Sequence, residues 1–279
     1  MLRKTETVYV QSDPFFSPRG KVLHRFDQFL AGLAEAQVPC VWLSGATRAQ
    51  LDEPRRRLGQ NDPYIGEGGS GVYLPEDYFH LKSGNALRLG RFSCLAVAKP
   101  QPAAAEALEE LAGELGASVV PLRTLSSREL SQNTGLPPKE AERMRLRDFD
   151  ELFFFAGAGE AEIAAFRREA GLRGLQCEPA GPFWSLSPGA SVATCIRQLG
   201  GLYDRALRSH ALLVGVAVAP AAGGPPAFPG GLFDRSFELT ERGEQESETE
   251  ESGKRARRSR FHLYSESVWE ELLAAILAR

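Results

Sequence analysis

The chain has 279 residues, of which 43% are hydrophobic and 25% charged, so one or two globular units with ordinary hydrophobic cores are expected. Its formal net charge of −3, with dispersed basic residues, excludes a nucleic-acid partner, and the lack of a signal-peptide core or a long apolar run excludes a membrane protein. Four widely spaced cysteines without metal-ligand spacing exclude a zinc site and a disulfide framework, which predicts a reducing, cytoplasmic location.

Residues 1–86 alternate strands and helices. Apolar strands are expected at 7–11 and 38–43, with an amphipathic helix at 22–36 between them and a further helix at 47–58. Because the second strand is almost wholly apolar and follows a helix, it is typical of a buried parallel strand. The pattern predicts an α/β fold whose core is a doubly wound, Rossmann-like parallel sheet.

Residues 87–181 repeat the alternation with a different spacing, which predicts an inserted α+β domain. Its elements are expected as strands 92–98, 119–121 and 152–155 and helices 103–115, 136–147 and 160–169. The chain then returns to the core over 182–279, with a helix at 192–206, a very apolar strand at 211–218 and a closing helix at 265–278.

Residues 241–260 form a charged insert in this last segment. Six glutamates precede a basic run that begins at Lys254. Such a composition cannot bury a core, so we expect a flexible, solvated loop. The alternative is an electrostatic contact with an anionic partner.

Asp13 directly follows the first apolar strand. A strand that carries an aspartate to the carboxyl edge of a sheet is a usual way to present a nucleophile to a phosphoryl group. The neighbouring Phe15 and Phe16 cannot move protons. An aspartate before Pro14 can also accept backbone amides in an Asx-type turn, so a functional and a structural role for Asp13 both stay open.

Further segments follow Asp13 in a recognisable order: Ser44-Gly45-Ala46-Thr47-Arg48 after the second strand, Gly66-Glu67-Gly68-Gly69, and Arg147-Asp148-Phe149-Asp150 in the inserted domain. In this order and spacing the chain resembles the haloacid dehalogenase-like phosphatases, and among them the mannosyl-3-phosphoglycerate phosphatases with an inserted cap domain. The resemblance implies that Asp13 is the nucleophile, that Ser44, Gly45 and Arg48 bind phosphate, and that Arg147 binds an acidic substrate.

The catalytic residues of that family are incomplete here. The family uses a second aspartate for proton transfer, and this chain has Phe15 at that position. Loss of a positioned proton donor lowers a rate by about 10²–10⁴-fold. The family also uses a lysine beside the phosphoryl oxygens and acidic residues that hold Mg²⁺, whereas residues 189–193 contain no lysine and residues 215–220 no carboxylate.

Candidate replacements are few. Arg197 lies one helical turn beyond the expected lysine, and Asp204 and Asp234 lie near the strand that should carry the metal ligands. Nothing in their spacing singles them out, and each is typical of a solvated helix or turn. If any metal binds, Asp13 is its expected ligand, and Mg²⁺ is expected as a cofactor only if the protein is active.

Three hypotheses follow. The first is a non-catalytic or severely weakened protein that binds a phosphorylated sugar acid or other small anion, or regulates through a protein partner, in mannosylglycerate metabolism. It would use Ser44, Arg48 and Arg147, because a helix start with free amides still attracts an anion. The alternative is an active Mg²⁺-dependent phosphomonoesterase that converts mannosyl-3-phosphoglycerate to mannosylglycerate with Asp13 as nucleophile. The third is a structural subunit of an active homologue.

Overall fold

The computed structural model describes residues 6–17, 20–79, 86–219, 228, 231–241 and 258–278. Most of the charged insert expected at 241–260 therefore lies outside the described residues. No helix in the described ranges is long and apolar enough to cross a membrane.

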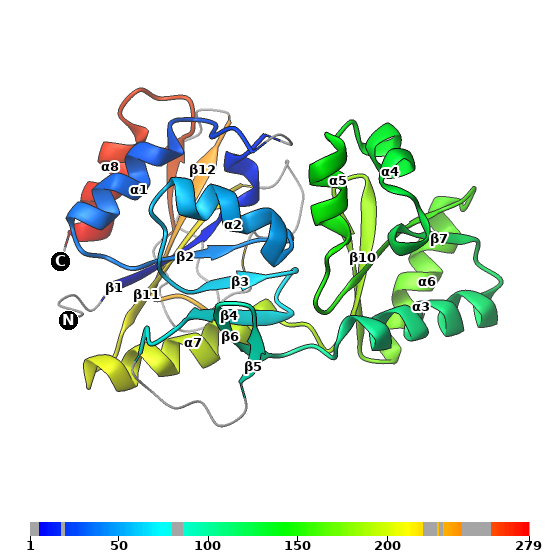
Figure 1. The fold of residues 1–279 in the computed structure, drawn as a ribbon. Coiled ribbons are helices and arrows are strands. Elements are labelled where there is room, and N and C mark those ends of the chain that lie inside the picture. Colours follow the sequence, from blue (N-terminus) through cyan, green and yellow to red (C-terminus); the bar gives the residue numbers. More distant parts are fainter. Residues whose placement is uncertain are drawn as a thin grey trace.

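The core of the molecule is a nine-stranded sheet with the strand order β13-β12-β11-β1-β2-β3-β4-β6-β5 (Figure 1). Six strands run parallel: β1 (Glu6–Gln11), β2 (Cys40–Leu43), β3 (Tyr64–Gly66), β11 (Leu212–Val218), β12 (Arg235–Thr240) and β13 (Arg258–His262). An antiparallel extension completes the sheet with β4 (Gly71–Pro75), β5 (Leu87–Leu89) and β6 (Phe92–Ala96). This confirms the predicted α/β fold with a large parallel sheet.

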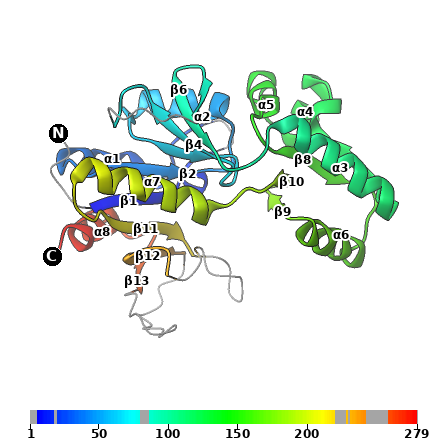
Figure 2. The same ribbon diagram turned by 90° about the horizontal axis from the view of Figure 1, so that it is seen from below.

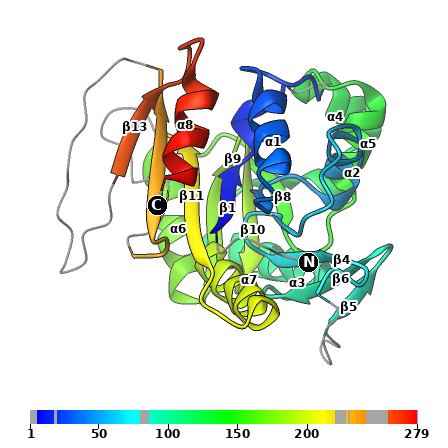
Figure 3. The same cartoon turned by 90° about the vertical axis from the view of Figure 1, so that its left-hand side faces the viewer.

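Helices cover both faces of this sheet, which explains why β1 is apolar throughout: Val8, Tyr9 and Val10 have no exposed surface. Figure 3 shows α1 (Phe26–Glu35) and α8 (Val268–Leu277) on one face and α7 (Val192–Leu207) on the other. The fourth core helix, α2 (Arg48–Arg57), packs Leu51 into the same apolar cluster as α1 and α8.

A second, antiparallel sheet of order β7-β8-β10-β9 forms the cap, which lies beside the core in Figure 2. Its strands are β7 (Val119–Pro121), β8 (Glu151–Phe155), β9 (Leu175–Ala180) and β10 (Phe183–Pro188). One face packs against α3 (Gln101–Leu115) and α6 (Glu160–Leu172), and the other against α4 (Ser127–Thr134) and α5 (Pro138–Arg145). Two single 3₁₀ turns complete the fold, η1 (Asp13–Phe15) and η2 (Leu122–Thr124).

The sheets place the domain boundaries differently from the expected 87–181. Strands β5 and β6 pair with β4 in the core sheet, where Phe92 packs edge-on against Tyr64, so the chain leaves the core only after Ala96. Strand β10 pairs with β8 and β9, so the chain returns to the core only after Pro188. Local alternation does not reveal which sheet a short strand joins, because pairing is decided by distant partners.

The carboxyl ends of β1, β2 and β3 meet at one edge of the core sheet, which faces the cap. Gln11 pairs with Leu43 and Leu43 with Ile65, and the ladder continues through the amide of Ser44, which donates to the Ile65 carbonyl at 3.0 Å. Residues that follow these strands therefore lie side by side at the edge of the sheet.

Candidate functional site

A cleft of about 690 Å³ separates this sheet edge from the cap. Its base is formed by the segments after β1, β2 and β3 and by the cap loop 146–150 between α5 and β8, and its walls by α2, α4, α5, β9 and β10. The charged lining residues are Asp13, Glu53, Arg57, Glu67, Glu140, Arg143, Arg147, Asp150 and Glu178.

Asp13 enters the cleft from the single turn η1. The turn is closed by the Phe15 amide, which donates to Ser12 O at 3.0 Å, and Pro14 occupies its second position, where the missing N–H and the fixed φ of proline are tolerated. This turn directs Phe15 into the core, where its ring has no exposed surface and stacks on Phe26 with 4.5 Å between ring centroids. The position that the resemblance assigns to proton transfer thus points away from the cleft.

Both oxygens of the Asp13 carboxylate have hydrogen-bond partners. The Ser44 hydroxyl donates to Oδ1, and the Gly45 amide donates to Oδ2 at 2.8 Å. Asp13 is open to solvent in the cleft, yet the protein atoms around its carboxylate raise its pKa; the bonds from Ser44 and Gly45 and the charge of Arg147 oppose that rise. The two donors nearest the strand ends are therefore engaged by the chain's own carboxylate.

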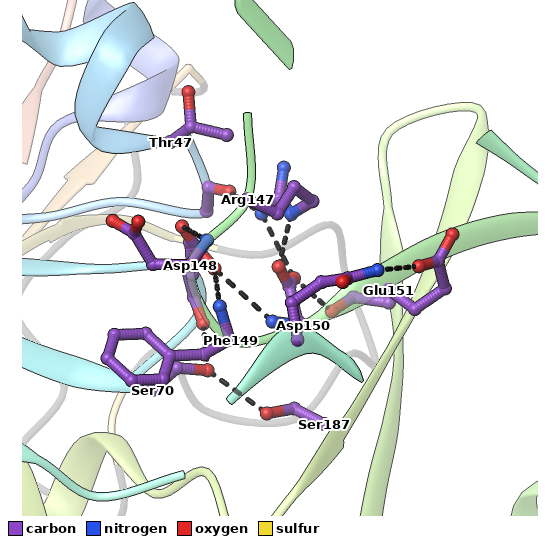
Figure 4. A network of polar contacts seen from close by, with 12 residues as sticks. Thr47, Ser70, Arg147, Asp148, Phe149, Asp150, Glu151 and Ser187 are labelled. Carbon is purple, nitrogen blue, oxygen red and sulfur yellow. Dashed lines mark hydrogen bonds and ion pairs between the residues drawn. The ribbon is translucent and has the colours of Figure 1, made fainter. Parts of the chain in front are cut away.

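Arg147 reaches the same place from the cap loop 146–150 (Figure 4). Its Nη2 donates to the Gly45 carbonyl at 2.7 Å and to Asp150 Oδ2 at 3.0 Å, and its Nε donates to Asp150 Oδ1. The Arg147 side chain is only 5% exposed and that of Asp150 2%. This bidentate pair fixes the guanidinium and neutralises its charge within the cap.

Glu67 is a site residue to which the sequence assigned no role. Its carboxylate accepts three successive amides of the cap loop, those of Asp148 at 2.9 Å, Phe149 at 2.8 Å and Asp150 at 3.2 Å. Burial raises the pKa of Glu67 to about 8, and the Asp150 carboxylate adds to the rise, whereas Arg147 and the Asp148 amide oppose it. The only sequence signal was its place in the glycine-rich turn before β4.

That turn has tight packing that requires glycine. Gly69 has φ of +94°, and a Cβ there would lie 2.4 Å from the backbone nitrogen of Val192 at the start of α7. Its carbonyl also accepts the amide of Ser191 at 2.9 Å. The turn is thereby held between α7 and the cap loop, and Glu67 is oriented toward the loop.

The structure brings together four of the five predicted site residues, and Arg48 is the exception. Asp13, Ser44, Gly45 and Arg147 are linked by direct hydrogen bonds. Arg48 instead donates to Asp148 through Nε at 3.1 Å and Nη2 at 3.3 Å, and it is not among the residues that line the cleft. Its guanidinium connects α2 to the cap loop behind the cleft.

The candidate replacements lie elsewhere. Arg197 is exposed on α7 and lines a separate hollow beside β6. Asp204 Oδ1 accepts the Ala211 amide at 2.7 Å, and Asp234 Oδ2 accepts the Leu213 amide at 2.8 Å. Those amides lie at the amino end of β11, whereas Asp13 lies at the carboxyl end of the neighbouring β1, so both aspartates are at the opposite edge of the sheet.

The residues at the strand ends do not fit the Mg²⁺ site that the resemblance implies. Mg²⁺ needs an octahedral set of oxygen ligands, usually with one or two carboxylates. Within the described residues, no three or more His, Cys, Asp or Glu side chains gather where they could hold a metal. Strand β11 ends in Val218 beside β1, where the family would supply its acidic ligands.

Comparisons with known proteins give two sequence relatives and many similar folds, although no family model matches the chain. A glucosyl-3-phosphoglycerate/mannosyl-3-phosphoglycerate phosphatase from Methanococcoides burtonii is 22% identical over 220 residues, or 75% of this chain and 79% of that protein. A mannosyl-3-phosphoglycerate phosphatase from Pyrococcus furiosus is 29% identical over 114 residues, covering 41% of this chain and 46% of that protein.

Among solved structures, a phosphatase of the haloalkanoate (HAD) enzyme superfamily from Bacteroides thetaiotaomicron has a TM-score of 0.54 at 17% identity, covering 84% of this chain and 83% of that one. A haloacid dehalogenase-like hydrolase from the same organism has a TM-score of 0.50 at 13% identity, covering 77% and 82%. At these identities the likeness shows a shared fold.

Proposed function

We propose that this chain, which has the fold of the haloacid dehalogenase-like phosphatases and resembles their mannosyl-3-phosphoglycerate branch in sequence, has lost phosphoryl transfer and binds a small molecule in its cleft. A cytoplasmic location, which the cysteine pattern predicts, is part of the same proposal. The fold supplies a cleft between core and cap, and binding needs fewer positioned groups than turnover does.

The position of Phe15 carries the proposal. Its ring is fully buried against Phe26 and meets Trp269 edge-on, with 5.6 Å between ring centroids. The residue that the resemblance aligns with proton transfer is therefore part of the hydrophobic core. The described residues also provide no lysine beside Asp13 and no carboxylate set for Mg²⁺. Proton transfer, cationic support and metal binding are separate contributions to phosphoryl transfer, and losing all three leaves little of the rate enhancement.

The ligand that the resemblance suggests is a phosphorylated sugar acid, which would place the protein in mannosylglycerate metabolism as a binding or regulatory protein. The presence of Arg147 beside Gly45 supports this ligand, because a guanidinium binds phosphate and carboxylate oxygens. The pairing of Arg147 with Asp150 and of Ser44 with Asp13 weighs against it, since both groups are already engaged.

The second candidate is an active Mg²⁺-dependent phosphomonoesterase with Asp13 as nucleophile. The observation in its favour is that Asp13 opens into the cleft at the carboxyl end of β1. A carboxylate there is placed to attack a phosphoryl group.

A phosphatase assay separates the two candidates. We expect purified protein with Mg²⁺ to hydrolyse neither mannosyl-3-phosphoglycerate nor 4-nitrophenyl phosphate faster than the Asp13→Asn variant does. Asp204→Asn is the matched control, because Asp204 lies at the opposite edge of the sheet. A Mg²⁺-dependent rate that Asp13→Asn abolishes and Asp204→Asn retains would establish the active phosphatase instead.

A further inference from the structure

The base of the cleft contains more acidic than basic groups. Three carboxylates, those of Asp13, Glu67 and Asp150, face one guanidinium, that of Arg147. Phosphatases that bind dianions in such a place compensate the nucleophile's charge with a metal and a lysine. Here the described residues supply neither, so a phosphate at this position would meet the Asp13 carboxylate with only Arg147, already paired with Asp150, to offset its charge.

The hydrogen-bond donors at the base are also occupied. The Ser44 hydroxyl and the Gly45 amide both donate to Asp13. The Arg147 guanidinium donates to Asp150 through two nitrogens and to the Gly45 carbonyl. An incoming anion would have to break these bonds before it gained any of its own, whereas an incoming cation or N–H donor would find the exposed carboxylate of Asp13.

The basic groups at the rim are engaged in the same way. Arg143 lies between Glu53, at 2.9 Å, and Glu140, at 2.8 Å. Arg57 donates through Nη2 to the Gly20 carbonyl. Each guanidinium that lines the cleft in the described part of the chain therefore already has an acceptor from the protein.

Part of the wall on the cap side is apolar. The cleft is lined by Leu136 from the loop before α5, by Met144 from α5 and by Phe183 from β10. Phe16 lines it from the core. Gln176 also lines the cleft, opposite Ser187 at the far end of the β9–β10 pairing from Phe183, and its side-chain carbonyl oxygen is buried with no hydrogen-bond partner among the described residues. This wall can take an apolar group and one further hydrogen-bond donor.

We propose that the cleft binds a small organic cation, with its ammonium group at Asp13 and an apolar portion against Leu136, Met144 and Phe183, in place of a phosphorylated sugar acid. The inference deepens the proposed function, since it rests on the loss of phosphoryl transfer. It treats the cleft as remodelled for the opposite charge.

The surrounding protein atoms raise the pKa values of Asp13 and Glu67, because burial disfavours the charged form of each carboxyl group, and Arg147 opposes the rise at both. The groups that face them are Arg147, Asp150, Ser44 and the amides of Gly45 and the cap loop.

Four fragments test the charge and the apolar group independently: benzylamine, phenyl phosphate, 3-amino-1,2-propanediol and glycerol 1-phosphate. Each is titrated into the full chain while chemical shifts are recorded by NMR. We expect benzylamine to bind most tightly, with a Kd on the order of millimolar for a fragment of this size. Exchange of its ammonium group for a phosphate, or of its ring for a diol, should weaken binding about tenfold or more.

Variants locate the binding. Asp13→Asn should weaken benzylamine about tenfold, and Met144→Gln should weaken benzylamine while leaving 3-amino-1,2-propanediol unchanged. Glu110→Gln is the control, because Glu110 is exposed on α3 outside the cleft, and it should change nothing. Circular dichroism verifies that each variant is folded.

The outcomes are distinct. Tighter binding of either phosphate ester than of either amine, no binding of benzylamine at any soluble concentration, or equal effects of Asp13→Asn and Glu110→Gln would each overturn the cation assignment. If glycerol 1-phosphate binds without turnover, the proposed binding function stands and only this inference fails. Mg²⁺-dependent hydrolysis of phenyl phosphate overturns the proposed function itself.

Discussion

Two adjacent phenylalanines have opposite environments at the end of β1. Phe15 has no exposed surface and stacks on Phe26, whereas Phe16 is only partly buried and lines the cleft. The single turn η1 points successive side chains in different directions, so Phe15 enters the core. In the phosphatases that the chain resembles, this position carries the catalytic acid. Phe15 therefore has a packing role that its sequence position alone does not reveal.

Replacement of each ring by a carboxylate measures this difference. We expect Phe15→Asp to lower the free energy of unfolding by about 4 kcal/mol or more, because it buries an unpaired charge and leaves a cavity. Phe16→Asp should cost about 1–2 kcal/mol, since its carboxylate can reach the solvent of the cleft. Urea unfolding followed by tryptophan fluorescence gives both values, and Phe15→Leu is the conservative control. Similar losses for both aspartate variants would contradict the assigned burial.

The contact between Asp13 and Ser44 could be anticipated from the sequence, but other parts of the site could not. Adjacent parallel strands end at the same edge, so residues after β1 and β2 must meet. The pairing of Arg48 could not be anticipated in this way, because its partner Asp148 belongs to the cap and lies 100 residues later. The role of Glu67 depends on three backbone amides, which no side-chain pattern indicates.

Among the elements, the long apolar ones were predicted well and the short polar ones were not. The strand expected at 211–218 is observed as Leu212–Val218, and the helix expected at 192–206 as Val192–Leu207. The helix expected at 136–147 is shorter, because Pro138 starts α5 and Gly135, with φ of 68°, ends the preceding α4. Strand β12 was not predicted because its sequence RSFELT is mostly polar. Its place in the sheet depends on pairing with β11 and β13.

Helix α2 contacts the cap through its N-cap residue, Thr47. The Thr47 hydroxyl accepts the Gln50 amide at 3.1 Å in a capping box and also donates to the Arg143 carbonyl of α5 at 2.9 Å. The Arg143 to Glu53 ion pair crosses the same junction. One residue thus stabilises both a helix and a domain contact.

The variant Thr47→Ala tests this double role. We expect a loss of about 2 kcal/mol in unfolding free energy, together with faster amide hydrogen exchange in α5. Ser126→Ala removes an equivalent capping box from α4 without a bond to the core, so it should cost about 1 kcal/mol and leave exchange in α5 unchanged. Thr47→Ser, which keeps the hydroxyl, should resemble the wild type. Equal costs for the two alanine variants, with α5 protected in both, would show that the Thr47 to Arg143 bond contributes nothing.

At the scale of the whole molecule, the α/β core with a separate cap sheet and the resemblance to haloacid dehalogenase-like phosphatases are confirmed. Alternating apolar strands and amphipathic helices determine such a core, because both faces of a parallel sheet must be covered. The loss of catalysis and the nature of the ligand stay proposals, since they depend on which charges meet across the two domains.

Buried carboxyl groups predict how the stability of the protein depends on pH. The pKa of Glu67 rises from 4.5 to about 8 on folding, and burial also raises those of Asp62 and Glu151. The folded protein therefore holds protons that the unfolded chain releases. The stabilisation from Glu67 is complete below pH 4.5 and is lost as the pH rises through 8.

We therefore expect the Tm of the wild type to fall between pH 6 and pH 9, and the slope to be reduced in Glu67→Gln. Differential scanning calorimetry across that range gives both slopes, and the slope is the readout even if Glu67→Gln lowers the Tm at every pH. Glu110→Gln, at an exposed site, should retain the wild-type slope. Parallel curves for wild type and Glu67→Gln would mean that Glu67 does not titrate in this range.

The three amide bonds that Glu67 accepts tie the cap to the core at a point distinct from its two covalent connections, and the contacts from α2 add to them. A cap joined to the core only by two linkers can rotate about a hinge, whereas the bonds from Glu67 at a further point oppose that rotation. A ligand would then enter the cleft by local unfolding of α4 and α5 at its rim. Destabilising α4 and α5 should shorten the residence time of a bound ligand far more than it changes the fraction of protein that is occupied at equilibrium.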